Sequence, residues 1–61
     1  MPVVQVHLKA GRTTEQKRRL VEKITDSLVE IAGANRERVH VIIDEVPADS
    51  WGRAGKLLSD D

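Results

Sequence analysis

The chain has 61 residues, with ten basic and ten acidic side chains and no cysteine. This length predicts one domain over residues 1–61, and the lack of cysteine excludes disulfides and thiolate metal sites. Zero net charge and a single aromatic residue, Trp51, argue against a nucleic-acid-binding surface. The two histidines, His7 and His40, lack zinc-site spacing, so we expect no bound metal.

The sequence also argues against a membrane partner. No apolar run approaches the roughly 20 residues that a helix needs to cross a bilayer. Charged and polar residues occur within the first ten positions, unlike in a secretory signal peptide. We therefore expect a cytoplasmic protein.

The first predicted element is a strand over Val3–Lys9, where Val4, Val6 and Leu8 alternate with polar residues. Gly11 then favours a turn.

A helix is predicted over residues 13–32. Thr13 and Gln16 have the spacing of a capping box, and Gly33 is a typical C-terminal stop. Most charged side chains of the segment, Lys17 among them, are expected off the apolar stripe. The stripe consists of Leu20, Val21, Ile24, Leu28, Ile31 and Ala32.

A second strand is predicted over residues 39–46, which are rich in β-branched side chains, as in a well-buried strand that ends before Pro47. Strand, helix and strand form an α/β (α+β) unit of β-α-β order, with parallel strands and a right-handed crossover. Residues 48–61 are predicted to form a loop with a short hairpin.

This small unit predicts self-association. One helix covers only one face of two strands, and a sheet needs more strands or a second layer for stability. Without disulfides or metal, the remaining source of stability is an oligomer whose sheets join between subunits.

Pro2 is the candidate catalytic residue. A proline at this position is a common, tolerated residue and is rarely catalytic when considered alone, but removal of Met1 would give Pro2 a free secondary amine. An α-amino group titrates near ~8, and an apolar pocket or a nearby cation lowers that pKa. A neutral amine can take a proton from carbon beside a carbonyl and return it elsewhere. With Met1 retained, the Pro2 nitrogen is an amide and cannot act as a base.

Nearly the whole chain resembles the 4-oxalocrotonate tautomerase family. The residues that carry the resemblance are MPVVQVH at 1–7, GRTTEQK at 11–17 and VIIDEV at 41–46. Gly52, Gly55 and Lys56 fit the C-terminal segment of that family. The Gly-Arg-x-x-Glu-Gln-Lys stretch, at its distance from an N-terminal proline, is the most specific part of this signature.

The resemblance implies a β-α-β fold assembled into homohexamers, as trimers of dimers. It implies an isomerase that interconverts unsaturated 2-hydroxy and 2-oxo acids without a cofactor, with the Pro2 nitrogen as base. Arg12 matches the position of the substrate-binding arginine of that family. The implied role is to hold a carboxylate or carbonyl oxygen, since a fixed bidentate cation suits an enolate-like transition state. Trp51 falls where an aromatic residue walls the site and excludes water, or it packs at a subunit contact. Leu8 matches a position whose backbone lies near substrate.

His40 departs from the family pattern, in which well-known members carry a second substrate-binding arginine. Histidine is neutral for much of the time near pH 7, so this departure leaves open whether the chain acts on a monocarboxylate or on the dicarboxylate of those members. Arg38, expected on the same strand face, or Arg53 near Trp51 offers a replacement cation. His40 fits a packing role equally well, and His7 is interpreted as structural.

Two other functions stay open at this point. A protonated Pro2 could act as the acid in hydration or dehalogenation of an unsaturated acid, although no carboxylate is evidently placed to activate water. Alternatively, the chain is a non-catalytic oligomeric binding module in which Pro2 is incidental. Blocking the N-terminus would separate this last function from the two enzymatic ones.

Overall fold

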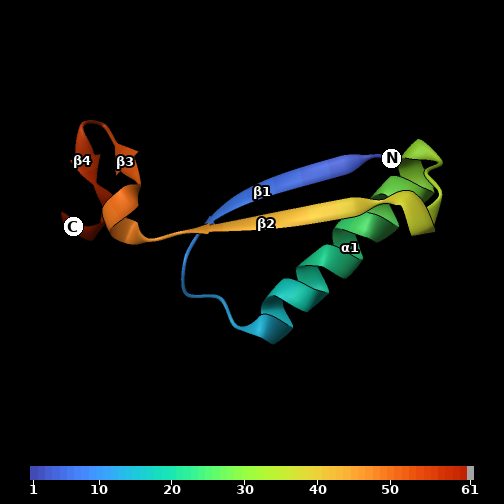
Figure 1. Cartoon of the computed structure of the whole chain (residues 1–61), viewed down its shortest axis with the longest axis horizontal. Helices are drawn as coiled ribbons and strands as arrows, with labels where there is room; N and C mark the ends of the chain where they lie inside the picture. The colour runs from blue at the N-terminus through green and yellow to red at the C-terminus, as the bar shows by residue number, and fades with distance from the viewer. Residues whose placement is uncertain (61) are drawn as a thin grey trace.

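A computed structural model describes residues 1–60 and confirms the predicted β-α-β order and fold class (Figure 1). Asp61, the last residue of the predicted domain, lies outside the described residues. The elements in chain order are β1 (Val3–Lys9), α1 (Thr14–Ala32), η1 (Arg36–Arg38), β2 (His40–Val46), η2 (Ala48–Ser50), β3 (Gly52–Arg53), β4 (Lys56–Leu57) and η3 (Leu58–Asp60).

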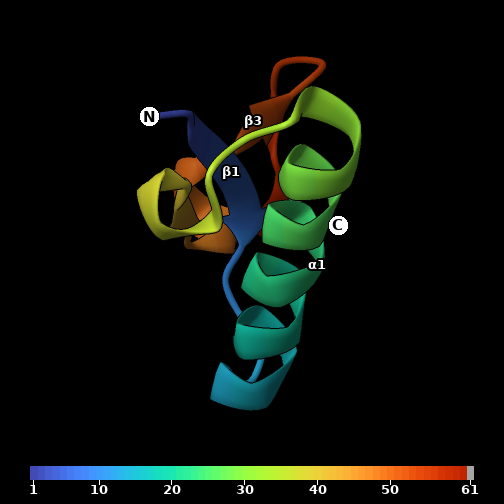
Figure 2. The ribbon, with the colours of Figure 1, turned by 90° about the vertical axis from the view of Figure 1, so that its right-hand side faces the viewer.

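Strands β1 and β2 pair in parallel, in a register that runs from Val3 opposite His40 to Lys9 opposite Val46. Exposure alternates along both strands, as the alternating sequence pattern predicts. Helix α1 lies against one face of the pair, as the end-on view in Figure 2 shows. The opposite face has no covering element in the part of the chain that is described.

Both predicted ends of α1 are confirmed. The backbone N–H of Gln16 donates to Thr13 Oγ1 at 3.1 Å, and that of Thr13 donates to Gln16 Oε1 at 2.9 Å, which completes the capping box. Gly33 ends the helix with φ of 69°, a left-handed conformation that favours glycine. Local side-chain chemistry therefore fixes where the β1–α1 loop ends.

The apolar stripe of α1 differs from the prediction at both ends. Ile31 is 85% exposed and Ala32 is also exposed, so the last turn of α1 does not bury its apolar side chains within one chain. Lys17 was predicted off the stripe but is half-buried, because its ammonium group bonds to Glu45 on β2. The inward face of α1 therefore begins with a charged residue.

The predicted second strand is wrong at its start. Strand β2 begins at His40, because Asn35 caps the short 3₁₀-helix η1 by accepting from the backbone N–H of Glu37 at 3.1 Å. Arg38 therefore lies in η1 and not on the strand face expected for it. The expectation of a well-buried strand is also not met within one chain, since Ile42 is 50% exposed.

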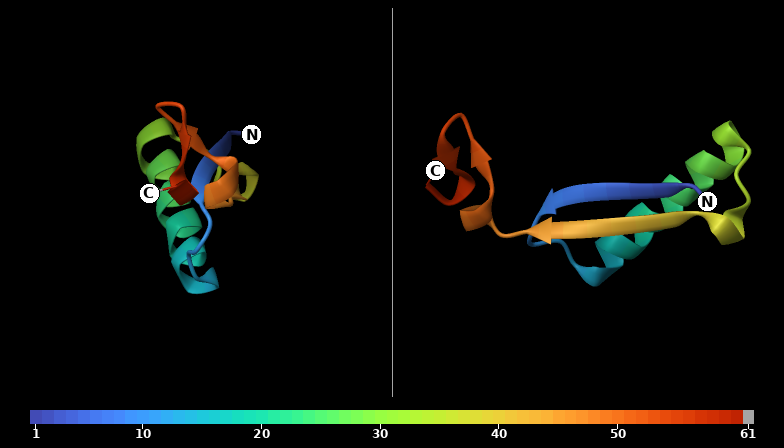
Figure 3. Two further views of the ribbon diagram at one scale, coloured as in Figure 1. Left: turned by 90° about the vertical axis from the view of Figure 1, so that its left-hand side faces the viewer. Right: turned by 45° about the horizontal axis from the view of Figure 1, so that its top comes forward.

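The predicted C-terminal hairpin is present. Strands β3 and β4 pair antiparallel around Ala54 and Gly55, which have φ of 54° and 82°, as a two-residue type I′ turn requires. The backbone N–H of Leu58 donates to the carbonyl of Trp51 at 2.9 Å and closes the segment on itself. Figures 1 and 3 show it extending beyond the strands as a separate arm.

A single chain has almost no core. Among residues 1–60 no hydrophobic side chain is fully buried, and the radius of gyration is 14.4 Å, against about 10.5 Å for a compact domain of this length. The accessible surface is 4742 Å², whereas a compact monomer of this mass exposes about 3,950 Å². None of the described helices is both long and apolar enough to cross a membrane.

Candidate active site

Arg12 lies in the loop that joins β1 to α1, and its side chain is exposed. Its Nη1 donates to the carbonyl of Lys9 at 3.4 Å, a long bond that leaves most of the guanidinium group accessible. The preceding residue, Gly11, has φ of 130°, which a residue with a side chain rarely adopts. The loop therefore presents a cation to solvent at the carboxyl end of β1.

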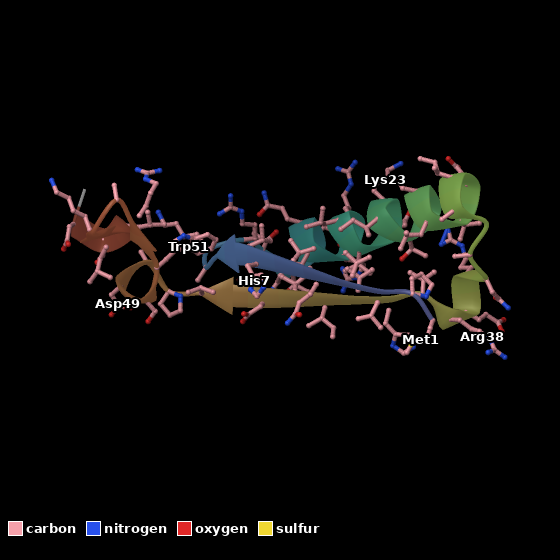
Figure 4. The ribbon with its side chains drawn as sticks, turned by 90° about the horizontal axis from the view of Figure 1, so that it is seen from above. Met1, His7, Lys23, Arg38, Asp49 and Trp51 are labelled. Atoms are coloured by element: carbon pink, nitrogen blue, oxygen red, sulfur yellow. The ribbon has the colours of Figure 1, made fainter. Side chains whose placement is uncertain are left out.

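Pro2 lies at the opposite end of β1, half-buried, with its carbonyl accepting from the backbone N–H of His40 at 2.9 Å. The alternation along β1 places Pro2 on the α1 side with Val4, whereas His40 is paired with Val3 on the open face. Arg38 lies near the same end in η1, as Figure 4 shows beside Met1. This end therefore gathers the candidate base with two of the candidate cationic residues.

Trp51 lies beyond the carboxyl end of β2 and is half-buried (Figure 4). It lines an open hollow of about 370 Å³ together with His7, Val46, Ser50 and Gly52. The indole thus walls a recess near the end of the strands where the Arg12 loop begins. Leu8, another candidate, is half-buried in β1 opposite Glu45 near that same end.

His7 and Asp44 form a cross-strand pair on the open face, with Nδ1 and Oδ2 3.0 Å apart. Both side chains are about half exposed, at 57% and 51%. No cluster of three or more histidine, aspartate or glutamate side chains able to hold a metal ion occurs within residues 1–60.

The candidate residues therefore divide into two groups at opposite ends of the sheet. Pro2, His40 and Arg38 lie at one end, and Arg12, Leu8 and Trp51 lie at the other. Strand β1 alone has seven residues, and at about 3.3 Å per residue it separates the groups by about 20 Å. Within one chain, Pro2 and Arg12 cannot contact the same small molecule.

A charged cluster holds the Arg12 end together. Lys17 Nζ donates to Glu45 Oε1 at 2.5 Å, and the two side chains are only 29% and 31% exposed. The hydrogen bond from Lys17 lowers the pKa of the Glu45 carboxyl; its positive charge and a hydrogen bond from the Gly11 backbone N–H act in the same direction, against the opposing effect of partial burial. The ion pair thus joins the end of β2 to the first turn of α1.

Comparison with known proteins agrees with this architecture. The profile of the tautomerase enzyme family matches residues 2–61. The chain belongs to the tautomerase family. This tautomerase is 50% identical over 60 residues to the 2-hydroxymuconate tautomerase of Bacillus subtilis, covering 98% of this chain and 97% of the relative. It is 47% identical to a probable tautomerase of Halalkalibacterium halodurans, with 98% of both chains covered.

Solved structures give the same result. The crystal structure of YwhB, a homologue of 4-oxalocrotonate tautomerase, superposes with a TM-score of 0.94 at 48% identity and 98% coverage of both chains. A second homologue of that enzyme superposes with a TM-score of 0.93 at 41% identity, covering 100% of this chain and 97% of the other. The resemblance seen in the sequence and the prediction of an isomerase enzyme are confirmed.

The sequence analysis of this tautomerase missed the cluster around Glu45. A signal was present, because Lys17 lies one turn before Leu20 and Val21 on the inward stripe, and a lysine there needs a charged partner. Identifying Glu45 as that partner requires the strand register, which places Glu45 opposite Leu8 at the end of β1.

The lowered pKa of Glu45 predicts an acid-dependent loss of stability. Folding lowers this pKa below its ordinary value of 4.5, so Glu45 stabilises the fold above that value and loses its contribution as pH falls through the folded-state pKa. We expect the stability difference between wild type and Glu45→Gln, measured by urea unfolding, to be largest near neutral pH and to shrink as the pH falls below the ordinary carboxyl pKa of 4.5. The exposed Glu22→Gln variant should show no such trend. A difference that stays constant with pH would contradict this role for the ion pair.

Proposed function

We propose that this tautomerase is a cofactor-independent isomerase that interconverts enol and 2-oxo forms of unsaturated acids, with the Pro2 nitrogen as general base once Met1 is removed. The observation that carries the proposal is the anchoring of Pro2 through its carbonyl oxygen, 2.9 Å from the backbone nitrogen of His40. This bond fixes the residue at the start of β1 and makes no use of its nitrogen. A base held in this way needs no reorganisation during the reaction.

The proposed reaction moves one proton from an oxygen atom to a carbon atom of the same substrate and consumes no other reagent. The neutral Pro2 amine takes the hydroxyl proton of the enol as the carbonyl forms. The electron pair of the conjugated carbon–carbon double bonds moves at the same time to the carbon atom that will be protonated. The protonated amine then delivers the same proton to that carbon. The reverse direction uses the same two steps, so one group serves as base and acid.

Arg12 is the proposed anchor for the substrate carboxylate, and Trp51 the proposed wall. An accessible guanidinium group binds a carboxylate through two parallel hydrogen bonds and stabilises charge on an enolate oxygen. The indole of Trp51 would exclude water from the recess and favour the neutral amine. Leu8 contributes its backbone near the same end, while Arg38 and His40 are proposed to meet the substrate from the Pro2 end.

A site that uses both Pro2 and Arg12 must be built from more than one chain, because one chain holds them about 20 Å apart. The accessible surface of 4742 Å² exceeds that of a compact monomer by about 800 Å², close to what one partner buries in a standard interface. The open sheet face and the exposed Ile31 and Ile42 are further candidates for such contacts. We therefore propose a homo-oligomer, with the hexamer implied by the family resemblance as its form.

Blocking the N-terminus tests the base. Purified active protein should begin at Pro2 by intact mass, because only a free amine accepts a proton. Alkylation of that amine should abolish most turnover of 2-hydroxymuconate while the circular dichroism spectrum stays native. Full activity in protein that retains Met1 would overturn the mechanism.

Mixing two inactive variants tests whether the site is shared between chains. Protein alkylated at Pro2 and the Arg12→Ala variant should each have little activity on a carboxylate substrate. After the two are unfolded together and refolded, random pairing should restore about a quarter of the sites, because one chain supplies Pro2 and the other Arg12. Refolding each alone is the control. A mixture no more active than its components would show that one site does not take Pro2 from one chain and Arg12 from another.

A substitution at His40 tests whether the site distinguishes dicarboxylate from monocarboxylate substrates. Arginine is charged at every working pH and histidine is not, so His40→Arg should raise kcat/KM for a dicarboxylate such as 2-hydroxymuconate. A monocarboxylate such as phenylenolpyruvate should be almost unaffected. An equal change for both substrates, or none, would show that His40 is a packing residue.

A further inference from the structure

We propose that Arg36 is a positioning residue for Pro2. Its side chain pairs with Asp26 on α1, and the short helix η1 that begins at Arg36 leads to His40, whose backbone N–H holds the Pro2 carbonyl. This inference rests on the proposed role of Pro2 as general base. Arg36 acts through the backbone and need not touch the substrate.

The position of Pro2 depends on the backbone of His40. Pro2 precedes the first paired residue of β1, Val3, which lies opposite His40. The His40 N–H donates to the Pro2 carbonyl at 2.9 Å. The Pro2 nitrogen is the proposed base, so its carbonyl is the backbone group through which the chain holds the residue. A shift of the His40 backbone would therefore move the base.

Arg36 joins α1 to the segment that carries the His40 N–H. Its Nη2 donates to Asp26 Oδ1, ten residues earlier in the chain, and its backbone carbonyl accepts from the N–H of Val39 at 3.3 Å. Val39 directly precedes His40. One residue thus connects the helix, through its side chain, to the start of β2, through its carbonyl.

Asp26 lies on the best-buried part of α1. The preceding residue, Thr25, is the one buried residue within residues 1–60, and its hydroxyl donates to the Val21 carbonyl at 2.8 Å. Asp26 is 30% exposed, whereas Arg36 is 55% exposed. The helix therefore supplies a well-held acceptor, and Arg36 attaches an exposed turn to it.

The other hydrogen bonds of η1 lie within the turn itself. The Asn35 side chain accepts from the backbone N–H of Glu37 at 3.1 Å, and its carbonyl accepts from that of Arg38 at 2.8 Å. These bonds shape the turn but do not attach it to α1. Loss of the ion pair would leave η1 held to the helix only through the chain before it, and the His40 N–H would be less firmly placed.

Amide hydrogen exchange and kinetics test the inference together. Arg36→Met and Asp26→Asn should each speed exchange of the His40 amide about tenfold, because the bond to Pro2 opens more often, and should leave amides in the middle of β2 unchanged. Turnover of phenylenolpyruvate should show kcat lowered about tenfold, as expected for a displaced base, with KM unchanged.

Rescue and control variants isolate the ion pair. Arg36→Lys keeps the charge and should retain most of the kcat, and the charge-reversed double variant Asp26→Arg with Arg36→Asp should recover it. Arg18→Met is the matched control, because it removes the exposed ion pair with Glu15 nearer the other end of α1. It should change neither His40 exchange nor kcat.

A purely structural ion pair gives a different result. It would lower the urea midpoint of Arg36→Met but leave kcat and His40 exchange as in wild type, and that outcome overturns the inference. An equal fall of kcat in Arg18→Met also overturns it. If the double variant does not fold, the comparison of Arg36→Met with Arg36→Lys still decides.

Alkylation of Pro2 separates this inference from the proposed function. Full activity after alkylation would refute the base, while His40 exchange would still report whether Arg36 holds this end of the sheet. Inactivation by alkylation together with a wild-type kcat in Arg36→Met would overturn the positioning role alone.

Discussion

The structure depends on one constraint, which is that a single helix covers only one face of a two-stranded sheet. Strands β1 and β2 satisfy their facing backbone groups in parallel pairing, but each also presents an outer edge, and one face of the pair is open. The buried apolar area of one chain is correspondingly small, since no hydrophobic side chain within residues 1–60 is fully buried. An ordinary folding free energy needs more burial than this, and further copies of the chain are the available source.

The same parallel pairing places the proposed catalytic groups. Chain direction puts Pro2 and the start of β2 at one end, and the Arg12 loop and Trp51 at the other. An antiparallel pair would have allowed one chain to bring its N-terminus close to a loop on the next strand. Here the length of the strands separates the proposed base Pro2 from the proposed anchor Arg12. Association of chains that buries the open surfaces would therefore also complete the proposed site. In the proposed oligomer, stability and activity would both be properties of the assembly.

Features encoded by neighbouring residues were predictable from the sequence, and features that depend on register were not. The capping box of Thr13 and Gln16 and the stop at Gly33 are local, and the structure confirms them. The error at Arg38 is also local, because the cap formed by Asn35 starts a 3₁₀ turn that the β-branched pattern concealed. The Lys17–Glu45 pair joins residues 28 positions apart, and the division of the candidate site needs the strand pairing itself.

The charge distribution at the Arg12 end explains why an acidic residue is compatible with the anion site proposed there. An unpaired Glu45 at this end of the sheet would lower the positive potential that the proposed anchor Arg12 supplies for a substrate carboxylate. With Lys17 bonded to Glu45, the cluster keeps a net positive charge, and the N-terminus of α1 immediately after Arg12 adds the positive end of the helix dipole. The charge of Glu45 is thus paired with Lys17, while Arg12 donates to a backbone carbonyl and keeps its charge for the proposed anchoring of a carboxylate.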